Sequence, residues 1–240
     1  MAGCACRRAE GKQAPVNRRK PNPASASDAA RGRLKRTALR LFSERGIDGV
    51  SVRDIVSTAD MKNGASLHYY FGSKDALIEE LVIDCSIRSD AARLKRLEQL
   101  EAAGGPRDLS DIIRLLIEAE ASLDYETERE DGTGGGHMRF IMALQINHRD
   151  LVLSALEGDD HADAYNRCVD HIRRFLADLP AETVRQRMAL MYIYIMSTMA
   201  AREAARLAAE DHPFWNSPAA LDAIVETTCG LLRGPSIPHT

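Results

Sequence analysis

The chain has 240 residues, of which 45% are hydrophobic and only 5% are aromatic. A chain of this length can bury a sufficient core without disulfides or other covalent links. Aliphatic residues and alanine dominate, and the alternating pattern that strands need is scarce, so an all-α protein is expected. Five scattered cysteines and the lack of an apolar leader predict a reducing, cytoplasmic setting. The longest uncharged apolar run, at residues 188–201, is too short to cross a bilayer, so no membrane contact is expected.

The net charge of −3 hides an asymmetry between two parts of the chain. Residues 1–77 contain 15 Lys and Arg against 7 Asp and Glu, a net charge of +8, while the remaining residues carry −11. A basic segment is attracted to phosphates through counterion release, and an acidic segment is repelled. The N-terminal part is therefore expected to bind nucleic acid, with chance clustering on a solvated surface as the alternative.

Residues 1–27 mix Arg, Lys, Pro, Ser and Ala without hydrophobic periodicity, which predicts a disordered basic tail. This tail is either an idle extension or an arm that reaches the minor groove. From Asp28 onward apolar residues recur at helical spacing, and the first helix should end at Gly46.

Three more helices are expected in this part. Ser51 and Asp54 have the spacing of a capping box and mark the start of the second helix. A turn at residues 60–62 leads to a short third helix at residues 63–70. Ser73 begins a fourth helix that runs to about Ala103.

The rest of the chain is expected to be helical at residues 108–126, 137–157, 160–178, 181–210 and 218–232, with a flexible glycine-rich loop at residues 131–136. The acidic group Asp159, Asp160, His161 and Asp163 is interpreted as a helix cap rather than a metal site. No metal or cofactor is expected. The Gly-x-Ser-x-Gly, P-loop, His-Glu-x-x-His and Cys-x-x-Cys motifs of enzymes are missing from the sequence.

Residues 51–56 are Ser-Val-Arg-Asp-Ile-Val, and residues 71–77 are Phe-Gly-Ser-Lys-Asp-Ala-Leu. With the short helix between them, these motifs make residues 34–77 resemble the DNA-binding domain of the TetR family of transcriptional regulators. The segment departs from the family pattern at Asp60, where glycine is usual, and by one extra residue between Ala59 and Phe71. The resemblance implies a three-helix helix-turn-helix domain at residues 28–77, followed by a helical effector-binding and dimerisation domain at residues 78–235.

A recognition helix presents polar side chains to the major groove of double-stranded DNA and apolar ones, here Leu67 and Phe71, to its own domain. The candidate DNA contacts are Arg33, Arg36, Ser51, Arg53, Lys62, Asn63, Ser66, His68, Tyr69, Tyr70 and Lys74. Asn63 can read adenine, and Lys74 adds a cation beside the free N–H groups of the fourth helix. Tyr70 is equally compatible with core packing, and the two arginines of the first helix with a solvated face.

The C-terminal part contains methionine, aromatic and polar residues that are typical either of an adaptable small-molecule site or of an ordinary core. The candidate effector contacts are Met138, Phe140, Met142, Gln145, Tyr165, Cys168, His171 and Tyr192.

A dimer interface of four helices, two from each chain, is expected from the last two predicted helices. The helix at residues 181–210 is apolar on nearly all sides and rich in alanine, so it should be covered from several directions. The last helix has an apolar face made of Leu221, Ile224, Val225, Thr228, Leu231 and Leu232.

These features predict a homodimeric repressor whose recognition helices enter successive major grooves of a near-palindromic operator. A small, largely apolar effector would release it by shifting a two-state equilibrium. The alternatives are a regulator with a filled C-terminal core that responds to a protein partner, an activator, and an enzyme with a DNA-binding head.

Overall fold

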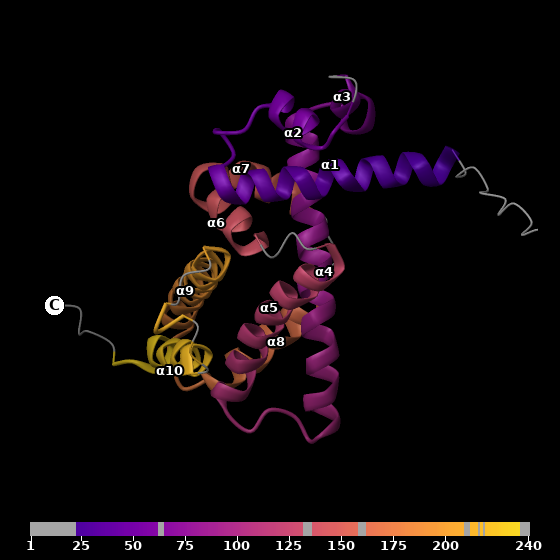
Figure 1. Ribbon diagram of the computed structural model, residues 1–240. Coiled ribbons are helices and arrows are strands. Elements are labelled where there is room, and N and C mark those ends of the chain that lie inside the picture. The colour runs from indigo at the N-terminus through magenta and orange to yellow at the C-terminus, as the bar shows by residue number, and fades with distance from the viewer. Residues whose placement is uncertain are drawn as a thin grey trace, which may run out of the picture.

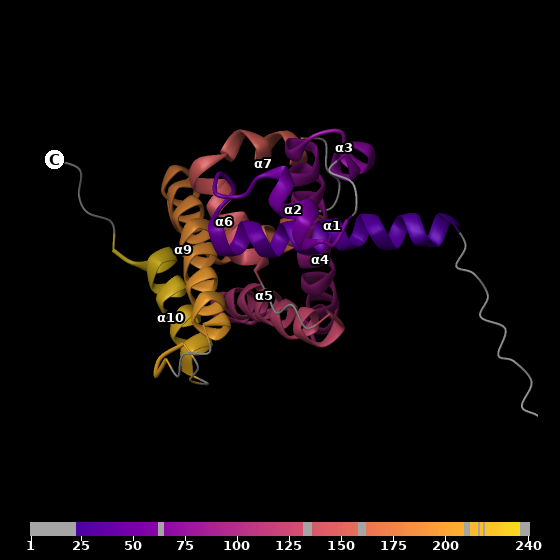
Figure 2. The same ribbon diagram turned by 45° about the horizontal axis from the view of Figure 1, so that its top comes forward.

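The computed structural model describes residues 23–61, 65–131, 136–157, 162–208, 212–215, 217 and 219–235. These residues form α-helices and no strand, which confirms the expected all-α class. The helices are α1 (Pro23–Arg45), α2 (Val52–Thr58), α3 (Ser66–Phe71), α4 (Lys74–Ala102), α5 (Leu109–Asp131), α6 (His137–Asn147), α7 (Arg149–Leu156), α8 (Asp163–Phe175), α9 (Ala181–Leu207) and α10 (Ala219–Arg233). α2 and α3 lie at one end of the long α4, while α9 and α10 run side by side at the outer edge of the molecule (Figures 1 and 2).

The N-terminal core forms where α1, α2 and α3 pack on the first turns of α4. Leu34, Ala38, Leu41 and Phe42 of α1 are fully buried there, as their helical spacing predicts. α1 begins at Pro23, five residues before the expected start, and proline is favourable in the first turn of a helix. Its N-terminal half extends beyond the other helices in both views (Figures 1 and 2).

The predicted capping box at the start of α2 is confirmed. The Ser51 Oγ accepts a hydrogen bond from the Asp54 backbone N–H at 3.2 Å, and the Asp54 carboxylate accepts one from the Ser51 N–H at 2.8 Å. The turn that follows α2 passes through Asp60, whose φ of +51° lies in the left-handed region. That conformation suits glycine, the residue that the resemblance leads one to expect here, because glycine has no Cβ.

The single helix expected at residues 137–157 was wrong, because the chain breaks into α6 and α7 at His148. His148 has φ −141° and ψ 45°, which is not helical. The change of direction lays α7 against the N-terminal core, where Val152 is 3% exposed. α5 is also longer than expected and ends at Asp131 instead of residue 126.

A residue from another helix caps the start of α8. Asp159, Asp160 and His161 lie outside the described residues. The Asp90 carboxylate of α4 accepts hydrogen bonds from the backbone N–H groups of Ala164 at 3.1 Å and Tyr165 at 2.9 Å. A distant carboxylate thus satisfies two of the free N–H groups at the start of α8.

Two apolar clusters share α4 and α6. The N-terminal cluster includes Phe140 of α6, whose ring stacks on that of Phe42 with centroids 6.0 Å apart. The C-terminal cluster is built from α5, α8, α9 and α10, and Met138 of α6 belongs to it. α6 therefore packs on both cores. Among the described helices, none is long and apolar enough to cross a membrane.

Four of the six residues expected on the dimer-forming face of α10 are covered by their own chain instead. Ile224, Val225, Thr228 and Leu232 are at most 3% exposed because they pack within their own chain, where α10 lies against α5 and α9. These side chains are therefore not available to a second subunit.

The conformation of Asp60 gives a direct test of the turn. Asp60→Gly should raise the free energy of unfolding by about 0.5–1 kcal/mol, and Asp60→Ala should lower it by about 1 kcal/mol, because only glycine adopts a positive φ without cost. Urea denaturation measures both changes. Thr58→Gly, at the last residue of α2, is the control and should be destabilising. Equal stability of the glycine and alanine variants at position 60 would contradict this account.

Candidate DNA interface and effector cavities

α3 separates its side chains as a recognition helix requires. Leu67 and Phe71 are 0% and 8% exposed and face the N-terminal core, whereas Tyr69 is 80% exposed. Tyr70 is half-buried, packs against the same core and lies edge-on to the Tyr69 ring, with centroids 5.0 Å apart. Ser66 is half-buried at the first turn. α3 thus presents Tyr69 outward, and Tyr70 supports it from within.

His68 is exposed on α3 and also helps to end this helix. Its ring Nδ1 lies 2.7 Å from the carbonyl oxygen of Gly72, whose φ is +80°. The left-handed conformation of Gly72 closes α3 and turns the chain toward α4. Two predicted contacts, Lys62 and Asn63, lie outside the described residues.

Lys74 holds the helix-turn-helix together. Its Nζ donates a hydrogen bond of 2.6 Å to the carbonyl oxygen of Ile47 and lies 5.5 Å from the centroid of the Phe42 ring. Ser73 caps α4 by accepting a hydrogen bond of 3.0 Å from the Ala76 N–H. The ammonium of Lys74 thus binds the segment that connects α1 and α2.

The other predicted DNA contacts lie on α1 and at the start of α2. Arg33, Arg36 and Arg53 are exposed, and the Arg33 guanidinium lies 3.7 Å from the sulfur of Met61. Ser51 is exposed, but its side chain is occupied by the capping box. The Ser51 side chain therefore stabilises the start of α2, and the charged groups of the three arginines lie at the surface.

Sequence reasoning missed a set of ion pairs that joins α1 to α4. Arg31 pairs with Glu80 and lies 5.0 Å from the centroid of the Phe71 ring. Lys35 pairs with Asp84 at 2.7 Å and with Glu80 at 3.1 Å. The signal was the matching spacing of four residues between the two cations and between the two acids, which places each pair on one helix face.

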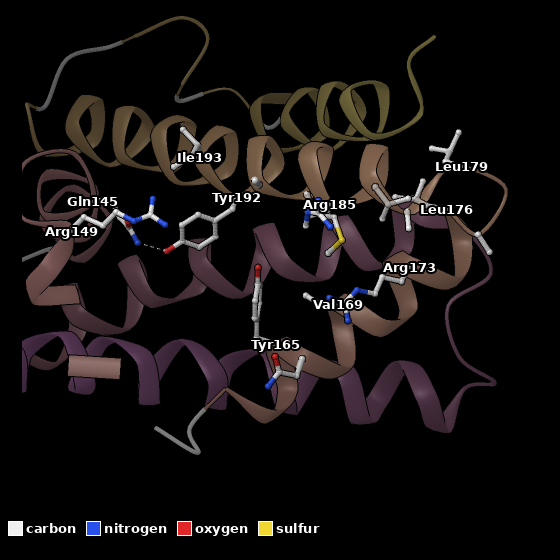
Figure 3. A pocket seen from close by; sticks show the side chains of 16 residues that line it. Gln145, Arg149, Tyr165, Val169, Arg173, Leu176, Leu179, Arg185, Tyr192 and Ile193 are labelled. Carbon is white, nitrogen blue, oxygen red and sulfur yellow. Dashed lines mark hydrogen bonds between the residues drawn. The ribbon is translucent and has the colours of Figure 1, made fainter. Parts of the chain in front are cut away.

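A cleft of about 800 Å³ opens between α8 and α9. Of the predicted effector contacts, Gln145, Tyr165 and Tyr192 line it (Figure 3). The Gln145 Nε2 donates a hydrogen bond of 3.1 Å to the Tyr192 hydroxyl. Burial raises the pKa of both tyrosine hydroxyls, so they stay neutral hydrogen-bonding groups.

A second cavity, of about 330 Å³, lies between α4, α5, α6, α7, α8 and α9. Met138, Tyr165 and Tyr192 are the predicted contacts that line it, and the two tyrosines thus border both spaces. Its polar lining includes Arg93 and Glu120, which sequence reasoning missed.

Four predicted effector contacts line neither cavity. Phe140 is fully buried against Phe42, and Met142 packs on the C-terminal core. Cys168 is fully buried, and this burial raises the pKa of its thiol to about 11. The ring Nε2 of His171 lies 3.2 Å from a carboxylate oxygen of Glu101, so His171 joins α8 to α4.

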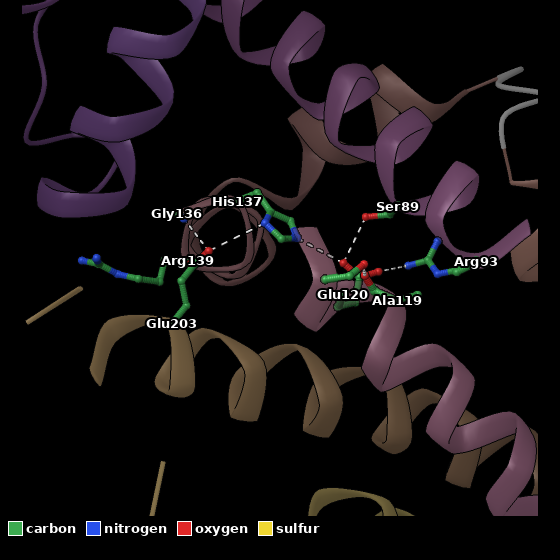
Figure 4. Close-up of polar contacts among 9 residues, drawn as sticks. Ser89, Arg93, Ala119, Glu120, Gly136, His137, Arg139 and Glu203 are labelled. Carbon is green, nitrogen blue, oxygen red and sulfur yellow. Dashed lines mark hydrogen bonds and ion pairs between the residues drawn. The ribbon is translucent and has the colours of Figure 1, made fainter. Parts of the chain in front are cut away.

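A buried polar network surrounds the start of α6 (Figure 4). The Glu120 carboxylate, 3% exposed, accepts hydrogen bonds from the Ser89 hydroxyl at 3.1 Å and from Arg93, and lies 3.1 Å from the His137 Nε2. The other ring nitrogen of His137 lies 3.7 Å from Glu203. His137 therefore stands between two buried carboxylates.

Glu203 of α9 supplies the cap that α6 lacks. Its carboxylate is 2% exposed and accepts hydrogen bonds from the backbone N–H groups of Gly136 and, at 3.0 Å, of Arg139. Gly136, the N-cap residue of α6, makes no side-chain cap of its own. A signal for the neighbouring Glu120 was present, because the helical period of α5 places it on the same face as Ile113, Leu116 and Ile117.

Comparison with known proteins places the N-terminal part in a family. The family described as bacterial regulatory proteins, tetR family, matches residues 35–81. The chain is 38% identical over 55 residues to the HTH-type transcriptional repressor KstR2 of Mycobacterium tuberculosis (strain CDC 1551 / Oshkosh), a match that covers 23% of this chain and 27% of that protein. It is 44% identical over 48 residues to the biofilm operon icaADBC HTH-type negative transcriptional regulator IcaR of Staphylococcus aureus (strain Newman), with 20% and 25% covered. The matches span about a quarter of these relatives.

The fold over 83% of the chain is similar to a solved structure. The crystal structure of a tetR family transcription regulator from Shewanella sp. PV-4 superposes with a TM-score of 0.55 at 17% sequence identity, covering 83% of this chain and 95% of that chain. The family match thus covers the helix-turn-helix, while likeness of fold extends over 83% of the chain.

The pKa of Glu120 makes folding stability depend on acid pH. Burial alone would raise this pKa, but the charge of Arg93 and the hydrogen bonds from His137 and Ser89 lower it from 4.5 to about 2. Because the folded-state pKa lies below the unfolded value, the carboxylate stabilises the protein above pH 4.5. We expect this contribution, about 3 kcal/mol, to be lost as the pH falls toward 2.

Urea denaturation across this pH range tests the expectation. Glu120→Gln should have a lower free energy of unfolding at neutral pH and a shallower decline in acid. Glu118→Gln is the matched control, because Glu118 lies on the same helix with its side chain 43% exposed. Parallel pH profiles for the wild type and Glu120→Gln would contradict the assignment.

Proposed function

The chain belongs to the TetR family of regulators, and we propose that it is a homodimeric repressor of transcription that a small, largely apolar effector releases from its operator. The observation that carries the DNA-binding part is α3, which buries Leu67 and Phe71 and exposes Tyr69. α2 and α3 stand at the end of the molecule away from α10 (Figure 1), where duplex DNA can approach them. The net charge of +8 over residues 1–77 favours binding to phosphates.

In this proposal the protein makes two kinds of contact with DNA, one to the bases and one to the phosphates. Tyr69 reads base edges or a thymine methyl in the major groove, and Arg53 holds phosphate from α2. His68 and Ser66 flank Tyr69 on α3 and contact the backbone or bases. Lys62 and Asn63 shortly precede α3 in the sequence, and on that ground they remain proposed DNA contacts.

Tyr69→Ala and Arg53→Ala separate these contacts. Tyr69→Ala should cost about 1–3 kcal/mol on the operator and less on random DNA, as for a base contact. Arg53→Ala should weaken binding to all duplexes and lower the salt slope by about one. Duplexes that the wild-type protein selects from a random pool supply the operator, and fluorescence anisotropy measures affinity.

The control for both variants is Arg107→Ala. Arg107 is 87% exposed in the connection between α4 and α5, at the other end of α4 from α3 (Figure 1). Arg107→Ala should leave the affinity for DNA and its salt slope unchanged. Wild-type affinity of Tyr69→Ala and Arg53→Ala on the operator would contradict the proposed interface.

The dimer interface in this proposal is the outer face of α9 and α10. On α9 this face includes Leu190, which is 59% exposed, and on α10 it includes Thr227 and Gly230. The Tyr194 hydroxyl lies 2.6 Å from the Thr227 hydroxyl and ties the two helices together beside this face. Small side chains along α10 let a second copy approach closely.

Gly230→Glu and Leu190→Glu test this interface. Apart from adjacent residues and the backbone of its own helix, nothing lies within 4 Å of the position that a Cβ on Gly230 would take, so glutamate fits the single chain and should add about 0.5 kcal/mol through helix propensity. In a dimer each carboxylate would be buried without a partner, at a cost of about 3 kcal/mol or more. Light scattering should find monomers.

Leu153→Glu is the matched control, because Leu153 on α7 is also 59% exposed. It should leave the association state of the wild type intact. Dimers of unchanged stability for Leu190→Glu and Gly230→Glu would place the interface elsewhere.

Effector release in this proposal depends on α6. α6 borders both spaces: Gln145 lines the larger cleft, and His137 and Met138 line the smaller cavity. Phe140 of α6 stacks on Phe42 of α1. An effector that displaces α6 therefore moves α1 and changes the spacing of the two recognition helices. The two cavities favour a small molecule over a filled core that responds to a protein partner.

A further inference from the structure

The cleft between α8 and α9 has an unbalanced charge. Three arginines, Arg149, Arg173 and Arg185, line it, and no carboxylate does among the described residues. Its other lining side chains are mainly apolar and include Val169 and Met188. The volume of about 800 Å³ is within the range of roughly 300–1,000 Å³ for sites that hold small organic molecules.

Arg173 and Arg185 enter the cleft from different helices. Figure 3 shows Arg173 coming from α8 and Arg185 from α9, with the cleft between them. Arg173 pairs with Asp170 at 3.3 Å, and Arg185 pairs with Glu182. The side chains of both arginines are more than half exposed, and such surface pairs contribute little, so a bound anion can replace the acidic partners.

The third arginine marks the other end of the cleft. Arg149 lies beside Gln145 in Figure 3 and forms no ion pair within the described part of the chain. Its positive charge acts on the Tyr192 hydroxyl, whose pKa burial raises and the Arg149 charge lowers. The lining of the cleft therefore holds three cationic side chains and no carboxylate among the described residues, beside a mainly apolar surface.

We propose that this cleft binds an amphipathic anion, an aliphatic chain with a carboxylate or phosphate head. Arg173 and Arg185 hold the head through charge-assisted hydrogen bonds, and the chain lies against Val169, Met188 and the Tyr192 ring. A cationic molecule is repelled from the cleft, and a neutral one leaves both arginines unused. This inference rests on the proposed function, since it names the chemical class of the effector.

The experiment compares four molecules with the same ten-carbon chain: decanoate, decyl phosphate, decanol and decyltrimethylammonium, each below its micelle concentration. Decanoate or decyl phosphate should raise the melting temperature, and the stronger of the two identifies the head group. Decanol and decyltrimethylammonium should bind at least about tenfold more weakly, because each lacks a charge-assisted contact. Equal binding of decanol overturns the proposal.

Variants locate the binding site. The double variant Arg173→Gln/Arg185→Gln should bind decanoate at least about tenfold more weakly, because each arginine supplies a charged hydrogen bond. Arg174→Gln is the matched control for position 173, because Arg174 is the next residue of α8 and does not line the cleft. Wild-type affinity of the double variant, or the same loss in Arg174→Gln, overturns the site.

A DNA-binding measurement keeps this proposal distinct from the proposed function. Operator binding by a wild-type protein that does not bind the two anions overturns the anion site alone. Decanoate binding that depends on Arg173 and Arg185 but leaves the operator bound supports the site and overturns effector release.

Discussion

The Glu203 carboxylate of α9 lies in the interior and accepts hydrogen bonds from two backbone N–H groups at the start of α6. Glu120 of α5 lies on the other side of His137 and binds Ser89 and Arg93 of α4. α4, α5, α6 and α9 thus meet at two buried carboxylates. Removing a partner would leave a charge without compensation in a low-dielectric interior, so this network fixes the position of α6 relative to the other three helices.

The position of α6 matters because this helix belongs to both apolar clusters. Met138 packs with the C-terminal helices, and Phe140, two residues later, stacks on Phe42 of α1. The wall of the smaller cavity contains His137 and Met138. The same short segment therefore borders the smaller cavity, is anchored by the buried network and contacts α1 of the helix-turn-helix.

Features with local causes could be predicted from the sequence. The capping box of Ser51 and Asp54, the buried stripe of α1 and the all-α class depend on residues close together in the chain, and the structure has them. The cap of α8 by Asp90 and the cap of α6 by Glu203 join residues far apart, which no local pattern reveals. Amphipathicity showed that α10 has an apolar face, but not whether its own chain or a second subunit covers it. For the site, the outward position of Tyr69 followed from helix geometry, whereas the arginines of the cleft come from separate helices.

Gly136 brings the backbone at the start of α6 into close contact with α1. Its φ is +118°, and the position that a Cβ would take lies 2.7 Å from the Ser43 hydroxyl oxygen of α1. The backbone of one part thus meets a side chain of the other without a flexible group between them. Because protein interiors resist compression, α6 cannot move closer to α1 without displacing α1.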